Sequence, residues 1–179
     1  MGIPARDIEH AEGYIVRYDS AKAGTRVYAM AAIGVGVCAA AILLGSEILI
    51  ALGLGALATA YYFYPFLEAR RARLGANEYG IFIEGFGLID WRSIRRIELV
   101  PTSVRSIILH ELQIQLSQPV SRALLVDWRR MPLYRRLMRL PWVITPDDNT
   151  LHVELDSFKQ SPETVHRTLQ SIWQHYRGW

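Results

Sequence analysis

Two uncharged apolar runs dominate this chain of 179 residues: VYAMAAIGVGVCAAAILL at residues 27–44 and ILIALGLGALATAYYFYPF at residues 48–66. Each run is close to the roughly 20 residues that a helix needs to cross a hydrocarbon core about 30 Å thick. Only Gly45, Ser46 and Glu47 separate the runs, which leaves no room for a domain between them. The sequence therefore predicts two transmembrane helices joined by a tight turn, with both chain ends on one side of the membrane.

The first run is not expected to be a cleaved signal peptide. Its leader, residues 1–26, is long and contains four acidic residues, and a second apolar run follows at once. The single cysteine, Cys38, lies inside the first run, so the sequence predicts no disulfide within the chain.

Basic residues flank the outer ends of both runs, and the turn between the runs has none. They are Arg17, Lys22 and Arg26 before the first run and Arg70, Arg71 and Arg73 after the second. Aromatic residues that suit the headgroup layer also cluster at the end of the second run: Tyr61, Tyr62, Tyr64 and Phe66. The positive-inside rule then predicts that both termini lie in the cytoplasm and that Glu47 lies on the other side of the membrane.

Small residues recur at helical spacing within each run. They are Ala32, Gly36 and Ala40 in the first run and Ala51, Gly55 and Thr59 in the second. Such rows let helix backbones approach closely in lipid, so we expect helix–helix packing there, either within the hairpin or between two copies of the chain. No ionisable residue lies in the middle of a run, which argues against a transporter or a channel.

After a basic linker at residues 67–76, the pattern changes to short strands. The sequence ELQIQL at residues 111–116 alternates between apolar and polar residues, as a half-buried strand does. Similar patterns predict strands at residues 79–83, 88–91, 95–100 (ended by Pro101), 123–128, 142–145 and 151–155, with a turn at residues 146–149.

A C-terminal amphipathic helix is predicted after these strands. Ser161 is expected to be its N-cap, with Pro162 and Glu163 in the first turn and Gly178 at the end. Its apolar stripe consists of Val165, Leu169, Ile172 and Tyr176. Residues 77–179 are therefore expected to form a mainly-β cytoplasmic domain, a small barrel or sandwich of about seven strands capped by the helix.

The sequence EYGIFI at residues 78–83, the turn after it and GLIDWRSI at residues 87–94 together resemble bacterial pleckstrin-homology-like (PH-like) domains. The hairpin placed before the domain and a leader such as residues 14–20 also resemble small membrane-anchored members of that group, which implies a location in the bacterial inner membrane. The resemblance implies a seven-stranded, two-sheet barrel capped by a helix, and it implies binding more than catalysis. PH domains that recognise phosphoinositides carry basic residues in the first turn, whereas this turn is Glu84-Gly85-Phe86-Gly87.

The most distinctive polar segment is WRRMPLYRRLMRLPW at residues 128–142, which contains no acidic residue. Its candidate binding residues are Arg129, Arg130, Arg135, Arg136, Arg139, Trp128 and Trp142. A helix over residues 132–140 would place leucines on one side and arginines on the other, as in helices that lie at anionic membrane surfaces. Packing of the leucines on the domain and binding of an acidic protein are the two alternatives.

Catalytic patterns are scarce. His110-Glu111 and His152-x-Glu154-x-Asp156 are the His–carboxylate clusters of the tail, and we interpret the second as the solvent face of a strand. We expect His166 and His175 to be exposed on the terminal helix. No nucleotide-binding, nucleophile-elbow or zinc motif is present in the sequence, so no enzyme activity, cofactor, metal or small-molecule substrate is expected. The formal charge of residues 67–179 is only about +4, which argues against nucleic acid.

Two functions follow as hypotheses. In the first, the chain is a membrane-anchored PH-like protein whose cytoplasmic domain binds another protein or the membrane surface. In the second, it is an accessory subunit of a larger inner-membrane complex, respiratory or photosynthetic for example, with the hairpin as its contact surface.

Overall fold

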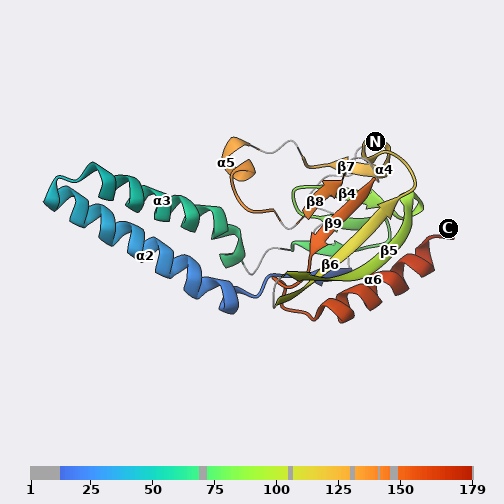
Figure 1. The fold of residues 1–179 in the computed structure, drawn as a ribbon. Coiled ribbons are helices and arrows are strands. Elements are labelled where there is room, and N and C mark those ends of the chain that lie inside the picture. The colour runs from blue at the N-terminus through green and yellow to red at the C-terminus, as the bar shows by residue number, and fades with distance from the viewer. Residues whose placement is uncertain are drawn as a thin grey trace. The chain divides into compact units, whose positions relative to one another are not determined.

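The computed structural model describes residues 13–68, 72–104, 107–129, 132–140, 142–145 and 149–178. They form two compact units (Figure 1). The sheet unit is drawn from Met1–Arg17, Arg70–Met131 and Leu140–Trp179, and the hairpin unit from Tyr18–Ala69 and Pro132–Arg139. The second unit thus joins the apolar hairpin to a short segment much later in the chain.

The hairpin unit consists of two antiparallel helices, α2 (Ser20–Leu44) and α3 (Glu47–Phe63), followed by a 3₁₀ turn, η1 (Tyr64–Leu67). Gly45 adopts a φ of 62°, and the N–H of Ser46 donates to the carbonyl of Ala41 at 3.1 Å. This is the Schellman end of a helix, in which glycine takes the left-handed position. The helix α3 ends three residues before the predicted end of the apolar run because η1 begins there, with Pro65 in its first turn.

The sheet unit contains two antiparallel sheets. The first has the strand order β1-β2-β3-β4-β7 and the second has the order β5-β6-β9-β8. The first sheet is built from β1 (Tyr14–Val16), β2 (Leu74–Ala76), β3 (Gly80–Ile83), β4 (Gly87–Asp90) and β7 (Leu124–Asp127). The second is built from β5 (Ile94–Val104), β6 (Ile107–Leu116), β8 (Trp142–Thr145) and β9 (Thr150–Glu154).

The chain passes from one sheet to the other between β4 and β5, between β6 and β7, and between β7 and β8. Short helical turns, η2 (Trp91–Ser93) and α4 (Val120–Ala123), lie in the first two connections. Within the described residues no strand pairing joins the sheets, so they do not close into a barrel. The antiparallel sheets and the C-terminal helix are as predicted, the described strands form no closed barrel, and the PH-like character of the domain stays a prediction.

The main core lies between the sheets and α6 (Pro162–Tyr176), which packs against β5, β6 and β2. The predicted cap is confirmed, since the Oγ of Ser161 accepts a hydrogen bond from the N–H of Thr164 at 3.3 Å. Val165 and Leu169 are buried, but the third buried residue of the helix is Trp173, and Ile172 and Tyr176 are only half-buried. The ring of Tyr176 instead stacks on Trp91, with the ring centroids 6.2 Å apart.

A second apolar cluster lies on the other face of the first sheet. Phe82 and Leu88 are buried and face each other across β3 and β4. Ile15, Ala72, Val126 and Trp128 pack against them. The ring of Phe82 lies over Gly75 of β2, where a Cβ atom would overlap the ring. The first sheet is therefore covered on both faces.

Two details of the predicted elements are wrong. The strand expected to end at Pro101 runs on to Val104, because β5 is the outer strand of its sheet, where the missing N–H of proline is tolerated. The helix expected over residues 132–140 is only α5 (Leu133–Arg136). The N–H of Arg139 donates to the carbonyl of Tyr62 in the hairpin instead of continuing the helix.

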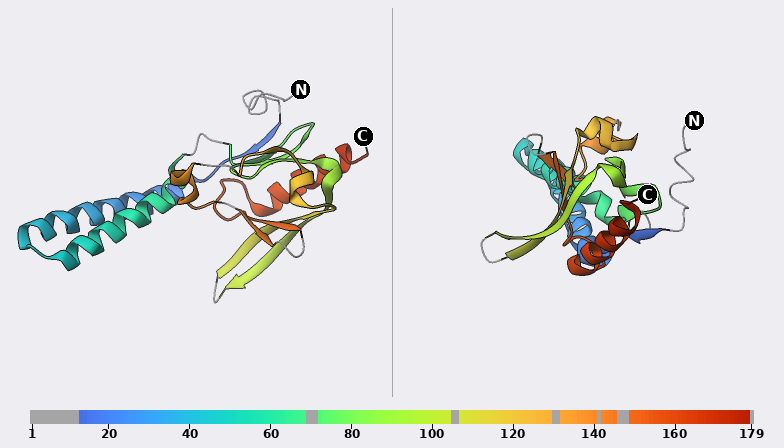
Figure 2. Two further views of the ribbon diagram at one scale, coloured as in Figure 1. Left: turned by 90° about the horizontal axis from the view of Figure 1, so that it is seen from above. Right: turned by 90° about the vertical axis from the view of Figure 1, so that its right-hand side faces the viewer.

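The strands β5 and β6 continue as a two-stranded ribbon beyond the rest of their sheet (Figure 2). The register explains this shape, since β9 pairs only with Glu111–Gln115 of β6. Strands β1 and β2, which the sequence patterns did not predict, pair with each other and extend the first sheet.

Candidate functional site

The two helices of the hairpin contact each other through small residues at heptad spacing. Gly34 and Cys38 of α2 face Gly53 and Leu57 of α3. The covered residues of α2 at this spacing are Val27, Ala31, Gly34, Cys38 and Ala41, and Ala60 of α3 is also buried. A Cβ atom on Gly34 would lie 2.8 Å from Leu57, and one on Gly53 would overlap the sulfur of Cys38. Glycine is therefore required at both positions for the helices to approach this closely.

The small-residue rows predicted from the sequence lie elsewhere on the helices. Ala32, Gly36, Ala51 and Gly55 are exposed, and a Cβ atom on either glycine would meet nothing within 4 Å. Ala40 and Thr59 are half-buried, and the hydroxyl of Thr59 donates to the carbonyl of Gly55 at 2.8 Å. The rows of exposed residues do not hold the hairpin together, so their packing against another chain stays a prediction.

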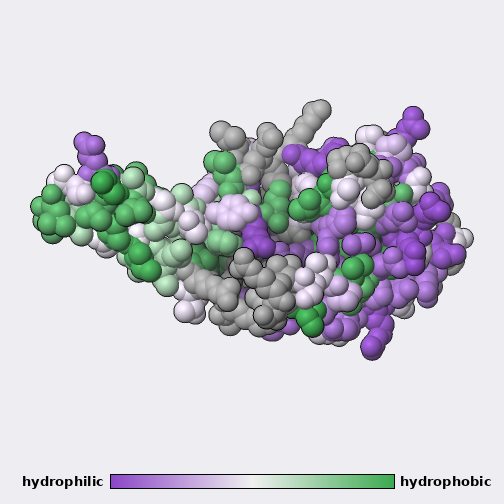
Figure 3. Space-filling model, in the orientation of Figure 1, coloured by the Kyte–Doolittle hydropathy of each residue, from purple (hydrophilic) through white to green (hydrophobic). Residues whose placement is uncertain are grey.

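Large apolar side chains cover the outside of the hairpin (Figure 3). Ile33 on α2 and Ile48, Leu52 and Leu54 on α3 are all more than half exposed. Of the 18-residue window Val27–Leu44, only 17% is buried, whereas the core helix of a water-soluble domain would be mostly covered. Within the described residues α2 is the one helix long and apolar enough to cross a membrane, and α3, with 17 residues, is one residue shorter than the apolar window of α2.

The segment Pro132–Arg139, which we call the arm, is bound to the open end of this hairpin, where α3 ends. The hydroxyl of Tyr61 donates to the carbonyl of Tyr134 at 2.8 Å, and the N–H of Arg139 donates to the carbonyl of Tyr62 at 2.9 Å. The guanidinium of Arg139 lies over the ring of Phe63, 5.7 Å from its centroid. These contacts join residues more than 70 positions apart in the sequence.

An ion pair supports the same junction. A guanidinium nitrogen of Arg135 lies 3.9 Å from the carboxylate of Glu68, just after η1. Tyr134 and Leu137 are exposed, whereas the side chain of Leu133 lies outside the described part of the structure, so packing of the leucines on the domain stays an open alternative. Among the other predicted binding residues, the side chain of Arg136 and the whole of Arg130 lie outside the described part of the structure.

The remaining predicted binding residues belong to the sheet unit. The indole of Trp142 donates to the carbonyl of Glu84 at 3.0 Å and packs edge-on against Phe86. Trp128 packs on the cluster of Phe82 and Leu88. Arg129 makes a bidentate pair with Asp127, at 2.9 and 2.7 Å, and this hydrogen bonding raises the pKa of its guanidinium. These side chains serve local packing and pairing, and the two tryptophans do not flank an amphipathic helix.

Arg73 also has a structural position. Its side chain is buried and forms an ion pair with Glu84 in the turn between β3 and β4. Its N–H donates to the carbonyl of Val16, so the same residue joins β1 to the start of the domain. Arg73, which the sequence places among the basic residues flanking the second run, is therefore paired with Glu84 inside the sheet unit.

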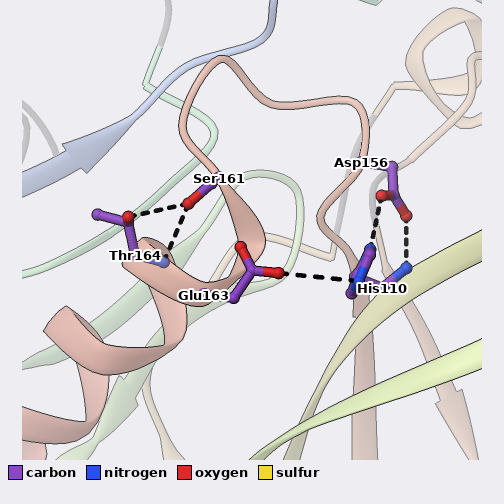
Figure 4. Close-up of polar contacts among 5 residues, drawn as sticks. All are labelled: His110, Asp156, Ser161, Glu163 and Thr164. Carbon is purple, nitrogen blue, oxygen red and sulfur yellow. Dashed lines mark hydrogen bonds and ion pairs between the residues drawn. The ribbon is translucent and has the colours of Figure 1, made fainter.

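The His–carboxylate clusters join elements of the sheet unit. Asp156, after β9, accepts hydrogen bonds from the backbone N–H of His110 at 2.5 Å and pairs with its ring Nδ1 at 3.0 Å (Figure 4). On the other side of the ring, Nε2 lies 3.9 Å from the carboxylate of Glu163 on α6. His110 thus links β6, the β9–α6 connection and the first turn of α6.

His152 occupies a similar position on the outer face of the second sheet. Its Nδ1 pairs with the carboxylate of Glu111, and its Nε2 lies 3.0 Å from the hydroxyl of Thr145. Glu154 accepts a hydrogen bond from Ser157 at 3.4 Å. Among the described residues no group of three or more His, Cys, Asp and Glu side chains is arranged to hold a metal ion.

The two other histidines lie on α6. His166 is half-buried, with its Nε2 3.4 Å from the carbonyl of Ile97, so its predicted exposure is wrong, whereas His175 is exposed as predicted. The arm and the end of the hairpin thus form the best-defined candidate surface, because exposed apolar rings, arginines and an apolar helix pair meet there. Comparison with family models, with curated proteins and with solved structures finds no match.

Proposed function

We propose that this chain is a non-enzymatic membrane-anchored protein. The hairpin crosses a bacterial inner membrane twice, and the sheet unit is a PH-like cytoplasmic domain that binds another protein or the membrane surface. The observation that carries the proposal is the apolar outer surface of α2 and α3. Burying one large aliphatic side chain is worth about 1.5–3 kcal/mol, so several exposed on each helix favour lipid over water.

The dimensions of the helices support two crossings. The 18 apolar residues of α2 extend about 27 Å and the 17 residues of α3 about 25 Å, close to a hydrocarbon core of about 30 Å. Glu47 begins α3 at the turn, and the tyrosines Tyr61, Tyr62 and Tyr64 lie exposed at its other end. Aromatic residues of this kind favour the headgroup layer.

The orientation rests on the basic residues around the open end of the hairpin. Since Arg73 is buried against Glu84, the bias comes from Arg17, Lys22, Arg26, Arg70 and Arg71, together with the arm. The turn at residues 45–47 has no basic residue. The positive-inside rule then places the open end in the cytoplasm.

The PH-like character of the sheet unit is supported by its architecture of two antiparallel sheets and a C-terminal helix. Two residues of the sequence resemblance, Gly80 and Trp91, are needed for packing within the sheet unit. A Cβ atom on Gly80 would overlap the carbonyl of Ile89, and the buried indole of Trp91 donates to the carbonyl of Asn77 at 2.9 Å. A fold of this kind hosts many binding functions, and we propose no catalytic role for the His–carboxylate pairs.

Cysteine accessibility tests the topology. In a Cys38→Ala background, single cysteines replace Ser46 in the turn and the exposed Glu78 in the sheet unit, and a membrane-impermeant maleimide is applied to sealed spheroplasts and to inverted vesicles. We expect Ser46→Cys to react in spheroplasts and Glu78→Cys to react in inverted vesicles. Reaction of both cysteines from the same side would contradict two crossings.

The accessory-subunit hypothesis has one observation in its favour. Gly36 and Gly55 leave open surface on the outside of α2 and α3, where another transmembrane helix can approach closely. Purification in a mild detergent distinguishes the two functions. A discrete large assembly at native expression levels supports the subunit hypothesis, and a lone monomer or dimer supports the first.

A further inference from the structure

We propose that the arm, Pro132–Arg139, lies in the headgroup layer of the bilayer and binds anionic lipid, with Tyr134 and Leu137 at the level of the upper acyl chains. This rests on the proposed function, because it needs the hairpin to be inserted. The proposal adds to that function a second lipid contact, the arm, and names anionic lipid as its ligand.

The depth of the arm follows from its contacts. It binds Tyr61, Tyr62 and Phe63, which form the last turn of α3, through two hydrogen bonds and the stacking of Arg139 on Phe63. If α3 crosses the membrane, this turn lies where the hydrocarbon core meets the headgroups. A segment held directly against it therefore lies at the same level.

The exposed side chains of the arm suit that level. Tyr134 is 57% exposed and Leu137 is 59% exposed, although both are large and apolar in body. The tyrosines at the end of α3 are also exposed, and Tyr61 bonds to Tyr134, so exposed aromatic side chains of the arm and of the hairpin meet at this point. The helix α5 is only four residues long, and its backbone needs polar partners that the hydrocarbon core does not offer. The headgroup layer offers polar partners for the backbone and lies next to the acyl chains that the apolar side chains contact.

The charge of the arm selects the lipid class. Residues 128–142 contain five arginines and no acidic residue, and Arg135 and Arg139 lie in the arm at the end of the hairpin. Guanidinium groups bind phosphate in a bidentate way and are attracted to the negative surface of a cytoplasmic leaflet. Anionic phospholipid is thus the ligand that fits both the charge and the apolar side chains.

An environment-sensitive probe tests the proposal on the full chain. In the Cys38→Ala background, a nitrobenzoxadiazole dye is attached to Leu137→Cys and, as a matched control, to Val143→Cys, which is an exposed apolar position of the sheet unit (67%). The protein is reconstituted in vesicles of phosphatidylcholine with or without phosphatidylglycerol. Spin labels are placed on the headgroups or deep in the acyl chains.

We expect the probe at residue 137 to shift to the blue and to be quenched more strongly by the headgroup label than by the deep label. The quenching should be several-fold greater than at residue 143 and should rise with phosphatidylglycerol. Arg135→Gln combined with Arg139→Gln should lower that rise, whereas Arg122→Gln in the sheet unit should not. A probe at residue 137 that behaves like the one at residue 143, or that ignores lipid charge, would overturn the proposal and favour an acidic protein as the ligand.

A probe at Leu52→Cys, exposed in the middle of α3, separates this proposal from the proposed function. Quenching at residue 52 by the deep label shows an inserted hairpin whatever happens at residue 137. Absence of quenching at residue 52 would overturn the transmembrane anchor itself and the arm proposal with it.

Discussion

Single glycines determine how closely the two apolar helices approach. Gly34 and Gly53 face each other across the hairpin, and the backbone oxygen of each lies 3.1 Å from where a Cβ atom on the other would stand. A side chain at either position must displace backbone or a neighbouring side chain. Two residues further along α3, Gly55 faces open space. Substitutions at Gly53 and at Gly55 therefore compare a crowded and an open position of the same helix.

We predict that Gly53→Ala destabilises the hairpin by about 1–3 kcal/mol, because overpacking forces the helices apart. Gly55→Ala should be neutral or slightly stabilising, since alanine favours the helix and meets nothing. The measurement is thermal unfolding of the full chain in detergent, followed by far-ultraviolet circular dichroism. Equal midpoints for the two variants would show that Gly53 is not in a helix contact.

Asn77 is a second residue with a defined role. Its side-chain oxygen accepts hydrogen bonds from the N–H groups of Tyr79 and Gly80, at 3.0 and 3.1 Å, and the residue is buried. These bonds form the turn that leads into β3. They lie next to Trp91, whose indole bonds to the carbonyl of the same residue.

We predict that Asn77→Ala lowers the free energy of unfolding by about 1–3 kcal/mol, because it leaves a buried N–H without an acceptor. Glu78→Ala, at the exposed neighbouring position, should change it by less than about 0.5 kcal/mol. Chemical denaturation followed by tryptophan fluorescence compares the two. A stable Asn77→Ala protein would mean that the turn does not depend on this side chain.

The tryptophans show where residue-level prediction fails. Trp128 and Trp142 flank a basic segment, and an amphipathic indole suits a membrane surface and a domain core equally well. The structure buries part of Trp128 against Phe82 and Leu88 and bonds Trp142 to Glu84. Only the tertiary partners distinguish the two environments, and the sequence pattern contains no sign of them.

Among elements, the link between β6, the β9–α6 connection and α6 depends on His110. Asp156 accepts from both the backbone and the ring of His110, whereas Glu163 lies 3.9 Å from the ring and is 58% exposed. The first contact is a close hydrogen bond to a charged group. The second is an exposed ion pair, which contributes little.

We predict that Asp156→Ala costs about 1–2 kcal/mol of stability, since it removes charge-assisted hydrogen bonds that hold a backbone N–H. Glu163→Ala should cost about 0.5 kcal/mol or less, mainly from its position in the first turn of α6. Unfolding curves of the two variants give the comparison. If the order were reversed, the junction would depend on α6 and not on Asp156.

Elements with strict local patterns were predicted well. Alternation identified β6 and β9, and the Ser-Pro-Glu start identified α6 with its cap. Strands β1 and β2 were missed because three residues each are too few for a periodic pattern, and Gly75 adds no side chain. The arm was expected to be a longer helix, but its backbone bonds to Tyr62 instead. Contacts between segments distant in the sequence form β1 and hold the arm, and a local pattern does not contain them.

At the scale of the whole molecule, the sequence predicted a helical hairpin and a mainly-β domain, and the structure has both. It did not indicate which small residues hold the hairpin together, because the i+4 rows at Gly36 and Gly55 and the heptad row at Gly34 and Gly53 overlap in composition. The sequence pattern also did not indicate that the arm belongs to the same compact unit as the hairpin.

Extraction of membranes tests whether the hairpin is a membrane anchor. Membranes from cells that express the full chain are washed with high salt and then with alkaline carbonate, and detergent serves as the control for release. We predict that the chain stays in the pellet after both washes and is released only by detergent, because two apolar helices are buried in lipid. Release by salt or carbonate would contradict the anchor and would make the apolar surface of α2 and α3 a protein interface instead.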